Sequence, residues 1–267
     1  MLIRKTLVFK TLLLVMTWYF ATSFQTIQTP LVKLVEPSKP LAVNSFTRIE
    51  FEQSMQTFYQ SLQADKYDLD FQSFNYAMMG YYGMLGQNKL ANERYVSIID
   101  FTKPSNEKRF YTIDLNQMKI IYHTYVAHGS NTGAVYAEKF SDIPQSHQSS
   151  LGFYVTGKTY MGNKGFSLKL HGDEAGYNKN MYDRGIVIHT ADYVSDAIAR
   201  AQGRLGRSWG CPVLPETVYK PIIHKIKNGS MIFAYYDDPA YLRNSKYLNT
   251  EKALAVFRAQ NHSRFSA

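Results

Sequence analysis

The chain has 267 residues, one cysteine and a formal net charge of +9 at pH 7. With 45 % hydrophobic and 15 % aromatic residues it can bury a core unaided, and a single cysteine excludes an intramolecular disulfide framework. The excess of positive charge favours anionic surroundings such as a charged polymer or a membrane face. The basic residues are scattered along the chain, which argues against a nucleic-acid-binding protein.

The first 23 residues are typical of a secretory signal. Basic side chains and no acidic ones precede the apolar stretch 12–21, which is too short to span a bilayer comfortably. The small residues Ala21-Thr22-Ser23 offer a cleavage site. An uncleaved amino-terminal anchor is the alternative. Either way, we expect a periplasmic or extracellular protein of the cell envelope.

A linker and a helical segment are expected next. Residues 24–44 contain Pro30, Pro37 and Pro40 and predict an extended linker. Residues 45–92 carry apolar side chains at helical spacing and predict a small helical segment. Its apolar positions are Phe46, Ile49, Met55, Phe58, Leu62, Phe71, Phe74, Met78, Tyr82 and Leu85. We interpret this methionine-rich and aromatic stripe as a packing surface rather than a ligand site.

From Tyr95 onward the pattern favours antiparallel strands rich in Ile, Val, Tyr, Phe and Thr. The expected strands are 95–101, 109–115, 118–127, 152–159, 166–170, 185–190 and 230–236.

Two helices are expected to interrupt these strands. The first covers 193–202, with Asp192 as its N-cap and Gly203 at its C-terminal stop, and the second lies between Pro215 and Asn228. The fold class is therefore mainly β (α+β), with one domain over residues 93–238 and a basic C-terminal tail over 239–267.

The stretch 152–159 matches the phosphate-loop pattern GxxxxGKT letter for letter. A phosphate loop must open a helix, but here its loop positions hold the strand formers Phe153, Tyr154 and Val155, and no helix can start in 160–165. We therefore interpret this stretch as a strand and expect no nucleotide.

Histidines on or beside the predicted strands offer one hypothesis. His171, Asp173 and His189 could hold a zinc ion that activates water for hydrolysis. No HExxH motif occurs, however, and such spacing often arises by chance. The more general interpretation is that these are core or hydrogen-bonded side chains.

The single cysteine offers a second hypothesis for the active site. Cys211 lies in the glycine-flanked segment 206–212, and His189 ends the apolar run 185–189, 22 positions earlier. A strand, a helix and a return loop can bring the two side chains together. A lone cysteine can be a small buried hydrophobe, but outside the cytoplasm a free thiol is a liability unless it is used or buried. A cysteine nucleophile with a histidine base is the interpretation we favour.

Several motifs together resemble the murein L,D-transpeptidase catalytic-domain family. They are Ile188-His189-Thr190, the segment Gly203–Pro212, the segment Val126–Gly133, Phe140-Ser141-Asp142, the segment Ser149–Tyr154 and the segment Ser167–Gly172. The similarity covers roughly Tyr95 to Asp238.

The resemblance implies an L,D-transpeptidase-like β-sandwich or barrel that acts on peptidoglycan stem peptides outside the cytoplasm. Cys211 would attack the third residue of a donor stem, release the terminal D-alanine and form a thioacyl enzyme. A second stem, a D-amino acid, an acceptor protein or water would then resolve that intermediate. No cofactor and no metal are expected.

The resemblance also assigns roles to individual residues. His189 would be the base, the backbone carbonyl of Thr190 would orient it, and amides around Gly210 and Cys211 would stabilise the oxyanion. His171 is the less favoured candidate for the base, because it lies further from Cys211 in the sequence. The residues expected to bind or line the substrate site are Arg207, Ser208, Trp209 and His171.

The chain departs from the commonest pattern of this family, which has a second histidine where Trp209 stands and an arginine where Val213 stands. These departures concern the residues that contact the stem peptide, and leave the nucleophile and the base in place. The main alternative function is a noncatalytic wall-binding module with the same fold. The less favoured one is the zinc-dependent peptidoglycan hydrolase.

Overall fold

The computed structural model describes residues 41–248 and 250–265, with side chains described over 48–248 and 251–260. The expected signal, residues 1–23, and residues 24–40 of the expected linker lie outside this range. The first described helix, α2 (Leu41–Ser61), begins inside the stretch expected as linker. Within the described part of the chain, no helix is long and apolar enough to cross a membrane.

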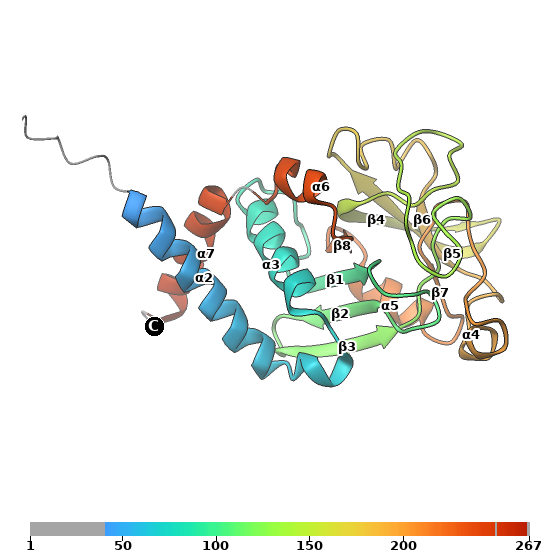
Figure 1. The fold of residues 1–267 in the computed structure, drawn as a ribbon, viewed down its shortest axis with the longest axis horizontal. Coiled ribbons are helices and arrows are strands. Elements are labelled where there is room, and N and C mark those ends of the chain that lie inside the picture. Colours follow the sequence, from blue (N-terminus) through green and yellow to red (C-terminus); the bar gives the residue numbers. More distant parts are fainter. Residues whose placement is uncertain (1–40, 249, 266–267) are drawn as a thin grey trace, which may run out of the picture. The chain divides into compact units, whose positions relative to one another are not determined.

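Eight strands in the described residues form one sheet with the order β3-β2-β1-β8-β4-β5-β6-β7 (Figure 1). They are β1 (Tyr95–Asp100), β2 (Phe110–Asp114), β3 (Lys119–Thr124), β4 (Gly152–Gly162), β5 (Gly165–Gly172), β6 (Val187–Thr190), β7 (Val213–Leu214) and β8 (Met231–Tyr235). The expected mainly β (α+β) fold class is confirmed, and strands predominate over helices within residues 93–238. The phosphate-loop-like stretch is part of β4 and leads into β5, so no helix follows it.

The sequence pattern predicted antiparallel strands, but two of the strand pairs are parallel. β8 pairs parallel with β1, and β6 pairs parallel with β7, whereas the other pairs are antiparallel. A parallel neighbour needs a crossover connection, and the helices between β6 and β7 and before β8 supply it. The two-residue strand β7 is too short to leave a periodic pattern and was not predicted.

Two helices cover opposite faces of the sheet. Phe153 of β4 lies against Gly80 of α3 (Phe71–Leu85), and three residues later Thr156 donates from Oγ1 to the carbonyl of Ile226 in α5 (Tyr219–Ile226) at 2.5 Å. Because side chains alternate along a strand, positions three apart point to opposite faces. Strands β1, β2 and β8 are buried at every position, as expected for a sheet covered on both faces.

Helix α2 packs on α3 and on the last described helix. Phe51 of α2 contacts Tyr82 of α3 and Phe257 of α7 (Thr250–Phe265), with ring centroids 6.0 and 5.0 Å apart, and α2 runs beside α7 in Figure 1. Much of the stretch 239–267, expected as a basic tail, is helical. Ile49, expected among the packed residues, is instead 52 % exposed.

A buried carboxylate fixes the short helix α6 (Pro239–Asn244) to the loop after β5. Glu174 accepts hydrogen bonds from the Tyr241 hydroxyl at 3.0 Å and from Ser245 Oγ at 2.5 Å. Burial raises the pKa of Glu174, while these donors act in the opposite direction. The 3-10 turn η1 (Ala64–Tyr67) joins α2 to α3.

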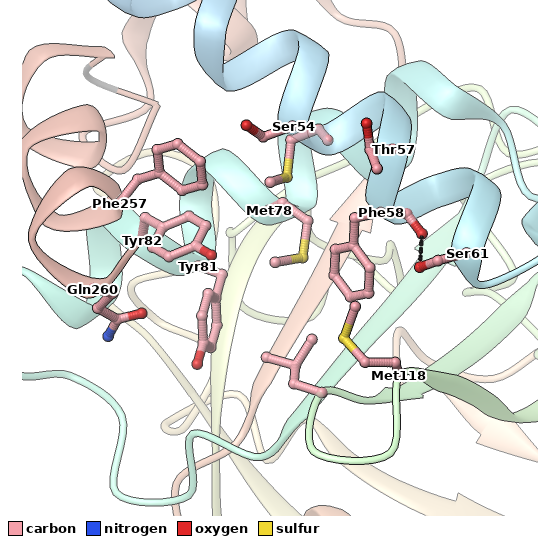
Figure 2. A pocket seen from close by; sticks show the side chains of 12 residues that line it. Ser54, Thr57, Phe58, Ser61, Met78, Tyr81, Tyr82, Met118, Phe257 and Gln260 are labelled. Carbon is pink, nitrogen blue, oxygen red and sulfur yellow. Dashed lines mark hydrogen bonds between the residues drawn. The ribbon is translucent and has the colours of Figure 1, made fainter. Parts of the chain in front are cut away.

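Figure 2 shows a pocket of about 400 Å³ among the helices, on the side of the turn between β2 and β3. Its lining residues are Ser54, Met55, Thr57, Phe58, Ser61, Met78, Tyr81, Tyr82, Leu115, Met118, Phe257 and Gln260. Some of the methionine and aromatic stripe that the sequence assigned to packing therefore faces a cavity. Cys211 and His189 are not among the residues that line it.

The helix before the cysteine segment begins later than expected. α4 covers Asp196–Gln202, and Ser195 rather than Asp192 is its N-cap, because Ser195 Oγ accepts the Ile198 N–H at 3.2 Å. Gly203 ends the helix in the left-handed region, with φ of 64°. In α5, Pro221 lies in the first turn, where no intrahelical N–H bond is lost.

Candidate active site

A second cavity, of about 680 Å³, lies where the β4–β5 hairpin, the start of β6 and the segment before β7 meet. Its lining residues are Tyr160, Gly162, Asn163, Lys164, Gly185, Val187, His189, Tyr193, Arg207, Ser208, Trp209 and Cys211. The cavity therefore gathers the cysteine, the histidine and three of the four expected substrate-binding residues.

The pairing of β6 with β7 explains how Cys211 and His189 share this cavity. His189 is opposite Val213 in a parallel register, so positions two residues earlier place Val187 beside Cys211. Side chains two apart lie on one face of a strand. The Val187 N–H lies 3.5 Å from Cys211 Sγ, which agrees with this placement. The thiol and the imidazole thus emerge on the same side of the strand pair.

The thiol of Cys211 is only partly exposed, and its surroundings favour the protonated form. Burial raises the pKa of Cys211, and this effect outweighs the opposing hydrogen bond from Val187 and the positive charges of Arg184 and Lys164. The Gly185 carbonyl lies 3.9 Å from Sγ and can accept the thiol proton in a hydrogen bond. A neutral thiol is the resting form at neutral pH.

The imidazole of His189 is held in one tautomer. Its Nδ1 lies 2.8 Å from the carbonyl oxygen of Thr190, and a carbonyl only accepts, so Nδ1 carries the proton. Nε2 is then the unprotonated nitrogen. Burial lowers the pKa of His189, the Thr190 carbonyl raises it, and the charge of Lys164 lowers it further. The imidazole is therefore neutral at neutral pH and can accept a proton at Nε2.

The turn before Cys211 requires a glycine. Gly210 has φ of 116°, and a Cβ there would lie 2.6 Å from the carbonyl oxygen of Gln148. Its N–H donates to Ser208 Oγ at 3.0 Å, and Ser208 Oγ donates to the Cys211 carbonyl at 2.7 Å. The Gly210 amide, expected as an oxyanion donor, is thus already bonded. The Cys211 N–H donates to no acceptor among the described residues.

Arg207, expected to bind or line the substrate site, donates to backbone carbonyls. Its Nη1 donates to Ser130 and Gly133, each at 3.3 Å. The same loop exchanges backbone bonds with the cysteine segment, from Ser208 N to His128 O at 3.0 Å and from Ser130 N to Ser208 O at 2.7 Å. The 128–133 segment therefore supports the turn that carries Cys211.

The sequence model described as "L,D-transpeptidase catalytic domain" matches residues 65–235. The chain belongs to this L,D-transpeptidase family.

Among solved structures, the chain is similar to several L,D-transpeptidases, at low sequence identity and low TM-score. An L,D-transpeptidase from Mycobacterium smegmatis is 10 % identical with a TM-score of 0.35, over 54 % of this chain and 59 % of that one. One from Stackebrandtia nassauensis is 13 % identical with a TM-score of 0.33, over 57 % and 61 %. An L,D-transpeptidase in complex with imipenem is 10 % identical with a TM-score of 0.34, over 53 % and 59 %. The chain therefore spans about three fifths of each. No curated protein matches.

Of the four residues expected to bind or line the substrate site, His171 is the one that does not line the cavity. Its ring stacks on Tyr182 with centroids 4.8 Å apart. Asp173, its partner in the zinc hypothesis, accepts from the Tyr247 hydroxyl at 2.6 Å and pairs with Lys89 and Lys246. Among the residues that the structure describes, no three histidine, cysteine or acidic side chains gather as metal ligands.

Two cations near the thiol were missed by sequence reasoning. Lys164 occupies the turn of the β4–β5 hairpin, and Arg184 is buried, donating to the carbonyls of Ser141 and Gln148 at 2.7 Å each. The segment 162–165 does carry a hairpin signal, with glycines flanking Asn and Lys. That signal places Lys164 at a hairpin tip but does not say what the tip faces.

Proposed function

We propose that this protein is an exported, cysteine-dependent L,D-transpeptidase that acts on peptidoglycan stem peptides through a thioacyl enzyme. The observation that carries the proposal is the shared face of Cys211 and His189, a thiol and a neutral imidazole that line one cavity. Membership of the L,D-transpeptidase family supplies the reaction class.

The first half-reaction starts from the neutral pair. Nε2 of His189 takes the thiol proton as Cys211 Sγ attacks the carbonyl carbon of the third stem residue. The Cys211 N–H, which has no acceptor in the described chain, is available to donate to the developing oxyanion. The carbon–nitrogen bond to the terminal D-alanine then breaks, and the imidazolium returns its proton to the leaving amine. A thioester and free D-alanine result.

The second half-reaction resolves the thioester. An acceptor amine attacks the same carbonyl carbon, Nε2 takes the amine proton, and the sulfur leaves as a thiolate that is then reprotonated. An amine of a second stem gives a cross-link, a D-amino acid gives exchange, and an acceptor protein gives attachment. Water would give a carboxypeptidase product. The chemistry needs only the thiol, the imidazole and the amide donor.

Intact-mass analysis after exposure to a carbapenem tests the nucleophile. We expect one adduct on Cys211, none on Cys211→Ala, and slower acylation for His189→Asn, with the exposed His224→Asn as the matched control. Purified protein should also convert disaccharide tetrapeptides to products that lack D-alanine. A protein that binds stem peptides but yields neither adduct nor product would instead be a wall-binding module. Activity that survives Cys211→Ala and is abolished by chelation would favour the zinc hydrolase.

A further inference from the structure

Trp209 is 74 % exposed although it lines the cavity that contains Cys211. The ring of His147 stacks against it, with centroids 4.8 Å apart and an interplanar angle of 8°. A parallel stack covers one face of the indole, so the exposed area belongs to the opposite face and the edges. The structure thus presents one open aromatic face beside the thiol.

This aromatic face is held in place from both sides of the stack. The His147 carbonyl accepts the Asn131 N–H at 3.1 Å, and Asn131 Nδ2 donates to the Ser146 carbonyl at 2.9 Å. On the other side, Ser208 is bonded through its backbone to the 128–130 segment. A rigid aromatic surface loses little conformational entropy when a ligand covers it. The stack is therefore pre-organised for contact.

A second aromatic side chain reaches the same cavity from the hairpin. Tyr160 is 38 % exposed and lies under Lys169 Nζ, 5.7 Å from the ring centroid. The cavity thus combines open apolar faces with the polar groups of Asn163, Lys164 and Ser208 and with no acidic side chain. Such a mixture suits an amphipathic ligand.

We propose that the open face of Trp209 is a stacking platform for a pyranose ring of an N-acetylated glycan strand, the strand that carries the donor stem. This inference rests on the proposed function. A pyranose offers a face of C–H groups, weakly positive, that an aromatic π-face attracts, while its hydroxyl and N-acetyl groups remain free for polar contacts.

The lengths involved agree with this placement. Only Gly210 lies between Trp209 and Cys211, so their Cα atoms are at most about 7 Å apart. In a stem attached to its sugar, three residues lead to the carbonyl that the thiol attacks, which spans about 10 Å when extended. The side chains of Trp209 and Cys211 extend from the backbone, and their length accounts for the difference between these two distances. A sugar stacked on Trp209 can therefore deliver its own stem to the sulfur.

Fluorescence tests the platform without catalysis. The chain has two tryptophans, Trp18 and Trp209, so Trp18→Phe in the full chain makes Trp209 the sole tryptophan emitter. We expect a saturable change in its emission on titration with an oligomer of β-1,4-linked N-acetylglucosamine that carries no peptide. The same change should occur with Cys211→Ser in that background. An emission spectrum that does not respond up to the solubility of the oligomer overturns the proposal.

Kinetics give a second, independent test. Trp209→Ala should raise KM about fivefold to tenfold for a disaccharide tetrapeptide, the range expected for one lost aromatic contact, and raise KM for the sugar-free tetrapeptide by a much smaller factor. Tyr136→Ala, which removes an aromatic side chain 53 % exposed and outside the cavity lining, is the matched control. Equal losses on both substrates overturn the proposal. A chain that binds the oligomer but turns over neither substrate refutes the transpeptidase and retains the platform.

Discussion

The charge of Lys164 acts on both groups of the proposed catalytic pair. It lowers the pKa of Cys211 and the pKa of His189, because a nearby positive charge disfavours the protonated form of either group. Burial raises the pKa of the thiol and lowers that of the imidazole. The resting pair is therefore neutral, and the thiolate forms only as the imidazole takes the proton during attack.

We expect Lys164→Met to move both pKa values upward. Alkylation of Cys211 by iodoacetamide should reach its midpoint at a higher pH in the variant, since the thiol loses a stabilising charge for its thiolate. Lys158→Met, an exposed lysine on β4 outside the cavity lining, is the control. An alkylation profile that matches the unaltered protein would show that Lys164 does not influence the thiol.

The proposed base predicts the acid limb of the pH–activity profile. Burial holds the pKa of His189 below its usual 6.5, and a protonated imidazole cannot accept the thiol proton, so activity should fall only at pH values below 6.5. In Lys164→Met this limb should shift to higher pH, because the pKa of His189 rises. Measurement of kcat/KM from pH 4 to 8 checks both statements. A limb that shifts to lower pH in the variant would contradict them.

At the scale of elements, the packing of α3 on the sheet depends on a glycine. A Cβ on Gly80 would lie 2.0 Å from the ring of Phe153, which itself stacks on Phe233 at 4.2 Å. Gly80→Ala therefore forces the helix away from the sheet, and we expect a loss of about 1–3 kcal/mol in the free energy of unfolding. Urea denaturation measures it. Gln72→Ala, an exposed position of the same helix, should have little effect, and a stable Gly80→Ala would refute the tight contact.

Elements with a strong local pattern could be predicted from the sequence, and those defined by partners could not. The strands of the mainly β fold were placed by their β-branched and aromatic runs. The parallel neighbours of β1 and β6 were not, because strand direction in a sheet depends on connections that no local pattern encodes. The N-cap of α4 was misplaced for a similar reason: Asp192 and Ser195 are both good caps, and the turn at 191–194 decides between them.

The same distinction holds for the candidate site. Cys211 and His189 stand out in the sequence because Cys211 is the single cysteine, in a glycine-flanked segment, and His189 ends an apolar run. The structure places both in one cavity. Gly210 was expected to offer its amide, yet Ser208 accepts it, which depends on a side-chain rotamer. The approach of Lys164 depends on how the β4–β5 hairpin bends, which local sequence does not determine.

At the scale of the whole molecule, a buried polar pair links stability to pH. Arg109 is fully buried and places Nη2 2.7 Å from Nδ1 of His128, whose Nε2 then donates to the Gly133 carbonyl at 3.2 Å. Burial, together with the charge of Arg109, lowers the pKa of His128 to about 3. Burial also lowers the pKa of Arg109 to about 9. The ring is therefore neutral in the folded protein at every pH near neutrality.

The folded protein should therefore lose stability as the pH falls. Below about 6.5 an unfolded chain binds a proton at His128 that the folded chain does not bind until about pH 3, so the loss accumulates across that interval. His128→Gln keeps an acceptor for Arg109 and a donor for Gly133, and should show a shallower decline in urea midpoint between pH 7 and 4. His224→Gln, at an exposed position, should follow the unaltered protein. Identical slopes for all three would contradict the prediction.

The position of β8 has a consequence for biosynthesis. This strand is the last of the sheet in the sequence, yet it lies between β1 and β4 and joins the three strands before it in the sheet order to the four after it. Until residue 235 has left the ribosome, a nascent chain holds two partial sheets with open edges and no shared strand. Such long-range closure is slow and leaves hydrophobic surface unprotected. The topology itself thus keeps both partial sheets incomplete until β8 has been synthesised.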